Sequence, residues 1–213
     1  MIKFMIRKDI CSFLHTIPSD VHVVAATKYG DASDIKTLYE AGIRNVGENR
    51  VDALLNKQYQ LGELKDLKWH FIGHLQRNKA KTVLNHIDCL HSLDSLKLAS
   101  MIEEIREKPL DTFIEVSINL EENKNGVPYY EVEEFINKIK GYSKIHLVGF
   151  MMMTIKNSGD FASQFAKLRK LRDEMEDKCN IKLPYLSMGM SEDYIYAIQE
   201  GATHIRLGRI LFD

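Results

Sequence analysis

The sequence predicts an α/β fold: a single (β/α)8 TIM-type barrel that spans residues 1–213 and carries an extra N-terminal helix. Short apolar runs alternate with amphipathic stretches along the chain, and eight such runs are present. No low-complexity linker divides the chain into domains. An open doubly wound sheet would show the same alternation, so the count of runs favours the barrel and leaves the open sheet as the alternative.

The apolar runs are predicted to be strands because each is short, apolar and followed by a turn. They are VHVVAATK (21–28), NVGE (45–48), KWHFIGH (68–74), IDCLHS (87–92), TFIEVSI (112–118), KIHLVGFMMM (144–153), LPYLSMG (183–189) and THIRLG (203–208). The stretches between them carry helical signals. Leu98, Met101, Ile102 and Ile105, for example, follow the spacing of one helix face.

Helix ends are also marked in the sequence. Ser33 is expected to cap one helix that ends at Gly42, and Ser191 to cap another that ends at Gly201. The first 14 residues have helical spacing, with apolar side chains at Ile2, Met5, Ile6, Ile10, Phe13 and Leu14. This spacing predicts the additional helix before the first strand.

Composition limits the classes of function. The formal net charge is -1, so no overall field attracts nucleic acid or an anionic membrane, and no apolar run is long enough to span a bilayer. Cys11, Cys89 and Cys179 lie far apart, which predicts reduced thiols of a cytoplasmic protein, with neither a disulfide framework nor a zinc site. His70 and His74 lie on a predicted strand and turn, so we expect no metal site from them.

Several predicted strands end in polar residues that a scaffold would not need. Lys28 ends the first run, and GENR (47–50), GHLQRNK (73–79), SMGMS (187–191) and RLG (206–208) follow others. The loops at the carboxyl ends of barrel strands build active sites in this type of fold. We therefore expect the functional site at this end of the barrel.

The last two motifs have the composition of a phosphate site. SMGMS places a glycine between Ser187 and Ser191, just before a helix, and RLG places Gly208 at the end of the last strand. Free backbone N–H groups at such positions bind phosphate, and hydroxyls add further bonds. The alternative is that both serines cap helices and the glycines only form turns.

A lysine across a barrel from a phosphate site suggests a Schiff base with an aldehyde cofactor. Pyridoxal 5'-phosphate carries both an aldehyde and a phosphate, and Lys28 is the candidate amine. The alternative is a solvated or salt-bridged lysine. Arg206 is two residues from Gly208 and shares its strand face, so it could meet the pyridine nitrogen or form an ion pair with Glu48 or Glu115.

These motifs together resemble one known family. ATK (26–28), GENRV (47–51), WHFIGHLQRNK (69–79), EENKNG (121–126), LSMGMSEDY (186–194) and IRLG (205–208) look like the motifs of the pyridoxal phosphate homeostasis proteins, in matching order. The resemblance covers nearly the whole chain. It implies a single barrel similar to the N-terminal domain of bacterial alanine racemase.

The resemblance also implies roles for particular residues. Lys28 would form the Schiff base, and Asn49 would line the cofactor site. Phosphate and pyridine contacts would come from Ser187, Ser191, Arg206 and Gly208. Lys124 would be a secondary landing point for the aldehyde, although a solvated loop is the alternative there.

The implied function is to bind, buffer and deliver pyridoxal phosphate inside the cell, without efficient catalysis. Apo forms of enzymes that use the cofactor would be the partners, and the chain is expected to be monomeric. A small amino-acid racemase or lyase with the same cofactor is the alternative, and a barrel aldolase is a weaker one. Racemisation needs an acid–base group opposite Lys28, and the second, β-rich domain that supplies it in alanine racemases is not expected after Asp213.

Overall fold

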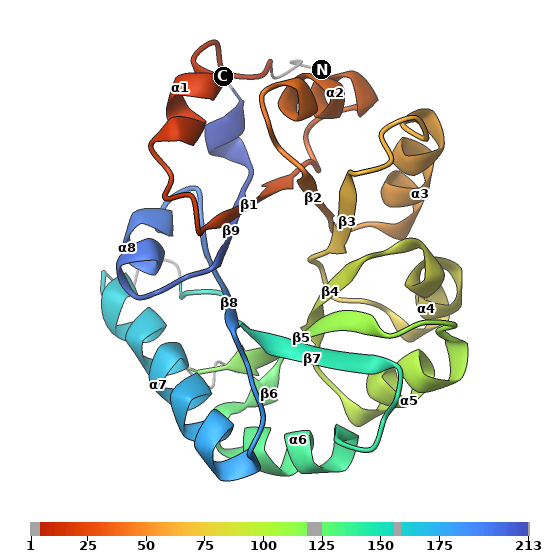
Figure 1. Cartoon of the computed structure of the whole chain (residues 1–213), viewed down its shortest axis with the longest axis vertical. Coiled ribbons are helices and arrows are strands. Elements are labelled where there is room, and N and C mark those ends of the chain that lie inside the picture. Colours follow the sequence, from red (N-terminus) through yellow and green to blue (C-terminus); the bar gives the residue numbers. More distant parts are fainter. Residues whose placement is uncertain (1–4, 119–124, 156–158, 213) are drawn as a thin grey trace.

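Eight parallel strands close into a barrel surrounded by helices (Figure 1). The computed structural model describes residues 5–118, 125–155 and 159–212. The barrel strands are β1 (His22–Ala26), β2 (Asn45–Glu48), β3 (Lys68–Phe71), β4 (Cys89–Leu93), β5 (Leu110–Ser117), β7 (Ile145–Met151), β8 (Tyr185–Met190) and β9 (His204–Leu207). β1 pairs with both β2 and β9, and β4 pairs with β5, which closes the ring. The predicted barrel is confirmed and the open sheet is excluded.

Helices follow the strands and cover the outside of the barrel. They are α2 (Ala32–Glu40), α3 (Val51–Gln60), α4 (Arg77–Val83), α5 (Leu96–Ile105), α6 (Val132–Ile139), α7 (Phe161–Cys179) and α8 (Tyr194–Gln199). One short strand lies outside the ring: β6 (Val127–Pro128) extends the far end of β5. Among the described residues, no helix is both long and apolar enough to cross a bilayer.

Successive side chains along each strand face alternately outward, toward the helices, and inward, into the barrel. Outward residues such as Ala25, Val46 and Ile205 are fully buried in one large core with the apolar faces of the helices, for example Ile35 and Leu54. A second, smaller cluster of Cys89, Phe113, Val148 and Met151 lies on the inward side of the strands. The interior is therefore packed with side chains and does not form an open channel.

One contact between strands depends on a glycine. Gly149 of β7 lies opposite Tyr185 of β8, and a Cβ atom added to Gly149 would lie 1.8 Å from the Tyr185 carbonyl oxygen. A side chain at this position would therefore push the two strands apart. Gly149 lets β7 and β8 approach each other where the register of β7 shifts against β5.

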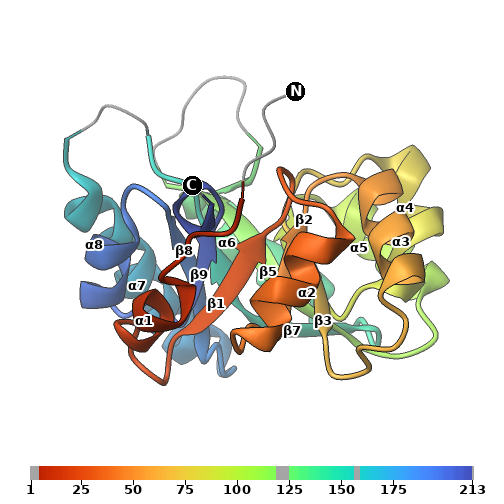
Figure 2. The ribbon, with the colours of Figure 1, turned by 90° about the horizontal axis from the view of Figure 1, so that it is seen from above.

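The N-terminal helix is shorter than predicted. α1 covers Ile10–His15, and Ile6 instead forms an antiparallel bridge with Phe212. Figures 1 and 2 place α1 beside α8, where the rings of Phe13 and Tyr194 meet edge to face. The first and last described segments thus lie together on the side of the barrel formed by β1 and β9.

Both predicted serine caps are wrong. Asp31 caps α2 through its side chain, which accepts from the backbone N–H groups of Ser33 and Asp34. Asp193 occupies the N-cap position of α8, and Ser191 bonds elsewhere. The helix ends at Gly42 and Gly201 are as predicted, and both glycines have a positive φ angle.

Candidate functional site

Lys28 lies just beyond β1, at the carboxyl end of the barrel. Its side chain is exposed, and its Nζ lies 4.7 Å from the centre of the Tyr29 ring. Ala25 and Thr27 face outward, toward the helices, where Ala25 belongs to the large core and Thr27 contacts Lys57 of α3. Val24 and Ala26 alternate with them and therefore face inward. This alternation places Lys28 on the same side of the strand as the inward-facing residues.

A buried ion pair fixes the backbone that leads into Lys28. Lys57 Nζ from α3 donates to the carbonyl oxygen of Thr27 at 2.7 Å and to Glu48 Oε1 at 2.5 Å. Thr27 Oγ1 donates to the same carboxylate oxygen at 2.6 Å. Glu48 is 1% exposed, so the pair is shielded from water and holds the ends of β1 and β2 together.

The predicted phosphate segments come together next to β1. Ser191 Oγ accepts hydrogen bonds from the backbone N–H groups of Gly208 at 3.2 Å and Ile210 at 3.3 Å. A Cβ placed on Gly208 would lie 3.6 Å from Ala26 Cβ, two residues before Lys28. Two backbone donors that converge on one oxygen form the kind of cradle that binds a phosphate oxygen.

The glycine in SMGMS is required by the same arrangement. Gly189 has φ +90°, and a Cβ at this position would lie 2.6 Å from Ala197 Cβ and 3.0 Å from Tyr194 Cα. The turn after β8 therefore lies directly against α8. This close packing places Ser191 where it can reach the end of β9.

Ser187 and Arg206 lie deeper, inside the barrel. Arg206 Nη1 donates to the carbonyl oxygen and Oγ of Ser187 at 2.8 and 2.7 Å, and Nη2 donates to the Met152 carbonyl oxygen at 2.8 Å. These three bonds leave the Nε–H group and one Nη2–H group for other acceptors. Burial lowers the pKa of Arg206 to about 10, so the guanidinium stays charged at neutral pH.

The ion pairs considered for Arg206 are not formed among the described residues. Glu48 binds Lys57 instead, because its side chain lies on the helix side of the barrel wall. Glu115 lies close enough for its charge to stabilise that of Arg206. Burial raises the pKa of Glu115 from its ordinary value of 4.5 to about 7, and the neighbouring Asp94 carboxylate adds to the rise.

Asn49 lies in the turn after β2 and is exposed. A Cβ on Gly73, which follows β3, would lie 2.6 Å from Asn49 Cβ, so the two turns are in close contact. They border a surface hollow of about 440 Å³ that Arg50, His74 and Lys79 also line.

His74 and His70 do not point toward a common site. His74 Nδ1 bonds Asp94 Oδ2 at 2.9 Å, whereas His70 bonds His91 inside the barrel. Lys124 lies outside the described residues.

Sequence reasoning missed a chain of buried polar groups that leads from Arg206 through the barrel. Ser187 Oγ lies 2.8 Å from His91 Nδ1, His91 Nε2 lies 2.8 Å from His70 Nδ1, and His70 Nε2 lies 3.0 Å from Asn45 Oδ1. The signal in the sequence was the polar residue within five of the apolar runs, at Asn45, His70, His91, Ser187 and Arg206.

The hydrogen bonds in this series of buried polar groups are all donated in the same direction. Burial lowers the pKa of His70 to about 4 and holds that of His91 well below its ordinary value, so both rings are neutral at pH 7. Asn45 Oδ1 accepts, which assigns the proton of His70 to Nε2 and leaves a lone pair on Nδ1. His91 Nε2–H then donates to His70, and the Ser187 hydroxyl donates to His91 Nδ1.

The sequence of this chain is similar to those of known proteins over most of its length. The model of the alanine racemase N-terminal domain matches residues 14–213. The chain is 39% identical to the pyridoxal phosphate homeostasis protein of Aquifex aeolicus over 89% of this chain and 85% of that protein. It is 32% identical to the one of Escherichia coli K12 over 92% of this chain and 86% of that protein. The chain belongs to the pyridoxal phosphate homeostasis protein family.

Solved structures support the assignment to this family. PipY of Synechococcus elongatus without the cofactor superposes with a TM-score of 0.91 at 32% identity, covering 97% of this chain and 99% of that one. PipY with pyridoxal phosphate bound superposes at 0.88 and 31% identity, covering 96% and 100%. Alanine racemase of Corynebacterium glutamicum, at 12% identity and a TM-score of 0.75, shares the fold over 97% of this chain and 61% of its own length.

The Glu48–Lys57 pair gives the first testable prediction. Lys57→Met should lower the free energy of unfolding by about 3–5 kcal/mol, because it leaves a buried carboxylate without its cation. A double variant, Glu48→Leu with Lys57→Met, should recover at least half of this loss, since replacing a buried pair by apolar groups is often nearly neutral. Urea denaturation measures both, with Lys36→Met on the exposed face of α2 as the control. A double variant less stable than Lys57→Met would contradict the prediction.

Glu115 gives a prediction on pH. Its folded-state pKa of about 7 is above the ordinary 4.5, so between these values the folded state binds more protons than the unfolded state. The contribution of Glu115 to stability is therefore fully present below pH 4.5 and is lost as the pH rises through 7. Glu115→Gln, which mimics the protonated form, should gain up to about 3 kcal/mol relative to the unmodified chain across this range. Urea titrations from pH 4 to pH 8 test this, and a constant difference between the two proteins would refute it.

Proposed function

We propose that this chain binds pyridoxal phosphate at the carboxyl end of its barrel and carries it, as a member of the intracellular machinery that buffers and delivers the cofactor. The observation behind this proposal is the convergence of the Gly208 and Ile210 N–H groups beside β1, whose next inward side chain is Lys28. The named function of the relatives and the cofactor bound in PipY point the same way.

The residues present fit the cofactor. Its phosphate would replace the Ser191 hydroxyl at the two N–H groups, and the same hydroxyl could then donate to a phosphate oxygen. When bound, the cofactor supplies an aldehyde that reacts with an amine and a ring that withdraws electrons. Lys28 would provide the amine, and its exposed position at the mouth leaves it accessible to an entering ligand.

Arg206 has the right properties to meet the pyridine nitrogen. It carries N–H groups beyond those used by Ser187 and Met152, and it stays charged with a pKa of about 10. Because a guanidinium only donates hydrogen bonds, it would hold the ring nitrogen unprotonated. An unprotonated ring is a weak electron sink, which favours carriage of the cofactor over efficient catalysis. Ser187 would act by orienting Arg206.

We further propose that the chain is a cytoplasmic monomer that passes the cofactor to apo-enzymes. The exposed position of Lys28 supports this, because transfer requires another protein to reach the bond between lysine and cofactor. The near-zero net charge gives no reason to expect nucleic acid as a partner. A racemase or lyase activity of low efficiency is the second possibility, since the cofactor itself labilises the α-proton of an amino acid.

The first experiment locates the bond to the cofactor. Purified protein should be yellow, and borohydride reduction followed by peptide mapping should place the label on Lys28. Lys28→Ala should lose the long-wavelength absorbance but keep measurable affinity, because the phosphate contacts come from other strands. Lys36→Ala is the control, since Lys36 is exposed on α2. A label found only on another lysine, such as Lys124, would refute the assignment of Lys28.

The second experiment separates carriage from catalysis. The protein loaded with pyridoxal phosphate is incubated with L-alanine in deuterated water, and deuterium at Cα and the D-isomer are followed. We expect turnover far below about 1 per second, the low end for ordinary enzymes. Turnover at or above this rate that disappears in Lys28→Ala would overturn the carrier function. Transfer to an apo-enzyme that is faster than release of free cofactor would support it.

A further inference from the structure

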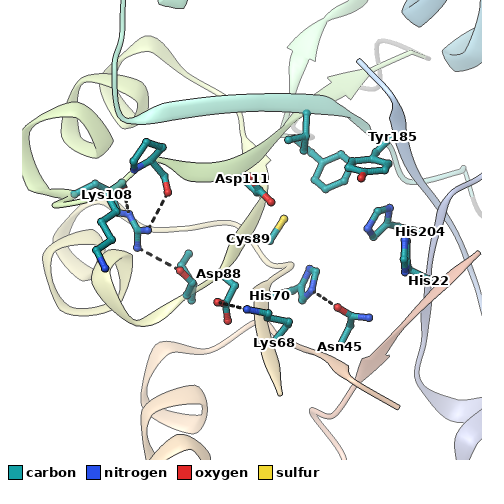
Figure 3. A pocket seen from close by; sticks show the side chains of 15 residues that line it. His22, Asn45, Lys68, His70, Asp88, Cys89, Lys108, Asp111, Tyr185 and His204 are labelled. Atoms are coloured by element: carbon teal, nitrogen blue, oxygen red, sulfur yellow. Dashed lines mark hydrogen bonds and ion pairs between the residues drawn. The ribbon is translucent and has the colours of Figure 1, made fainter. Parts of the chain in front are cut away.

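The opposite end of the barrel carries a second pocket that the proposed function does not use. It has a volume of about 390 Å³ and is lined by residues at the starts of the strands (Figure 3). His22 of β1 and His204 of β9 lie on one side of it, and His70 and Cys89 on another, with His70 bonded to Asn45. The pocket thus joins solvent to the buried polar chain in the barrel interior.

Three potential metal ligands meet behind the wall of this pocket, and two of them, His70 and Cys89, line it. His70 of β3 and Cys89 and His91 of β4 place one nitrogen or sulfur atom each within 4.8 Å of one another, and all three side chains are buried. We propose that His70, Cys89 and His91 form a binding site for a divalent transition-metal ion, with Zn²⁺ as the best match. This proposal does not depend on pyridoxal phosphate, which would bind at the other end of the barrel.

The side chains around the site already orient the two imidazoles. Asn45 Oδ1 accepts the Nε2 proton of His70 at 3.0 Å, so the Nδ1 lone pair of His70 points toward His91. Ser187 Oγ lies 2.8 Å from His91 Nδ1, the ring nitrogen that faces away from His70. A hydrogen-bonding partner on the second nitrogen of each ligating histidine is the usual outer shell of a zinc site.

Binding requires a small movement and a balanced transfer of protons. His70 Nδ1 and His91 Nε2 are 2.8 Å apart, whereas two nitrogens on a tetrahedral Zn²⁺ are roughly 3.4 Å apart, from bond lengths of about 2.0–2.1 Å. His91 must shift its proton from Nε2 to Nδ1, where Ser187 Oγ can accept it. Cys89 must lose its thiol proton to solvent. The net release is therefore about one proton for each ion bound.

The chemistry of the ligands selects the ion. A thiolate and two imidazoles favour Zn²⁺ or Co²⁺ over Mg²⁺ and Ca²⁺, which prefer oxygen. The fourth position faces the pocket, where water can complete the tetrahedron. His204 is a second candidate for that position, since its ring lies 6.4 Å from that of His70 and 6.2 Å from that of His91.

The proposed site differs from the expectation from the sequence. The three cysteines are far apart in the chain, and His70 and His74 do not converge, so no metal site was predicted. The fold brings together ligands from two adjacent strands instead. His70 pairs with Cys89 in the register of β3 and β4, and His91 is the next inward residue on β4.

Cobalt titration of the full-length protein, after removal of metal by a chelator, tests the proposal. One equivalent of Co²⁺ should give the thiolate charge-transfer band in the near ultraviolet and the visible bands of a tetrahedral ion. Addition of Zn²⁺ should remove both, and a pH indicator in weak buffer should record about one proton released per ion. Cys89→Ser should lose the charge-transfer band, and His70→Gln should weaken binding at least tenfold.

The controls separate this site from adventitious binding. Cys179→Ser removes another buried cysteine and should leave the titration unchanged. Circular dichroism must show that the Cys89→Ser and His70→Gln variants fold, and Cys89→Ala serves as a second variant if serine disrupts the interior. A charge-transfer band that survives in folded Cys89→Ser or Cys89→Ala, or the absence of stoichiometric binding by the unmodified chain, would overturn the proposal. Titration with and without pyridoxal phosphate should give the same stoichiometry.

Discussion

The pairing of β4 with β5 is the contact on which the rest of the molecule depends. It closes a sheet of parallel strands, so the inward side chains between the two ends of the barrel face one another across the interior. Because these side chains are buried, each polar group placed there needs a hydrogen-bonding partner. Closure also separates the two ends of the strands, so the proposed cofactor site and the proposed metal site lie on opposite faces of one packed core.

Two separate systems of hydrogen-bonded, buried polar groups lie on opposite sides of the barrel wall. On the helix side of the wall, Lys57 donates to the Thr27 carbonyl oxygen, and Glu48 accepts from both Lys57 and the Thr27 hydroxyl. These bonds fix the start of the Lys28 turn. On the inward side, Arg206 begins a series of hydrogen bonds that continues through Ser187 and His91. Arg206 stands at the proposed cofactor end of the second system and His70 at the metal end. A change of proton position at His91 would therefore reach the hydroxyl that orients Arg206.

Local sequence predicted the barrel, because the alternation of apolar runs and amphipathic stretches is a local property. The composition of the strand ends is local as well, and it placed the expected site at the carboxyl end of the strands. Local sequence predicted neither the helix caps at Asp31 and Asp193 nor the shorter N-terminal helix, since a bridge between Ile6 and Phe212 depends on contacts across the whole chain. The place of Ser187 was also beyond local reasoning. A serine near a glycine turn suggests phosphate, but the register of β8 against β9 places it beside the Arg206 guanidinium. The meeting of His70, Cys89 and His91 depends on the pairing of β3 with β4 and could not be read from spacing.

The Ser191 hydroxyl satisfies two backbone donors after β9. It accepts hydrogen bonds from the N–H groups of Gly208 and Ile210, so neither group depends on a ligand for its partner. A ligand that enters exchanges one set of satisfied bonds for another, and a ligand that leaves does not strand the backbone. Under the proposed function, this segment of backbone would keep its hydrogen bonds both with and without the cofactor.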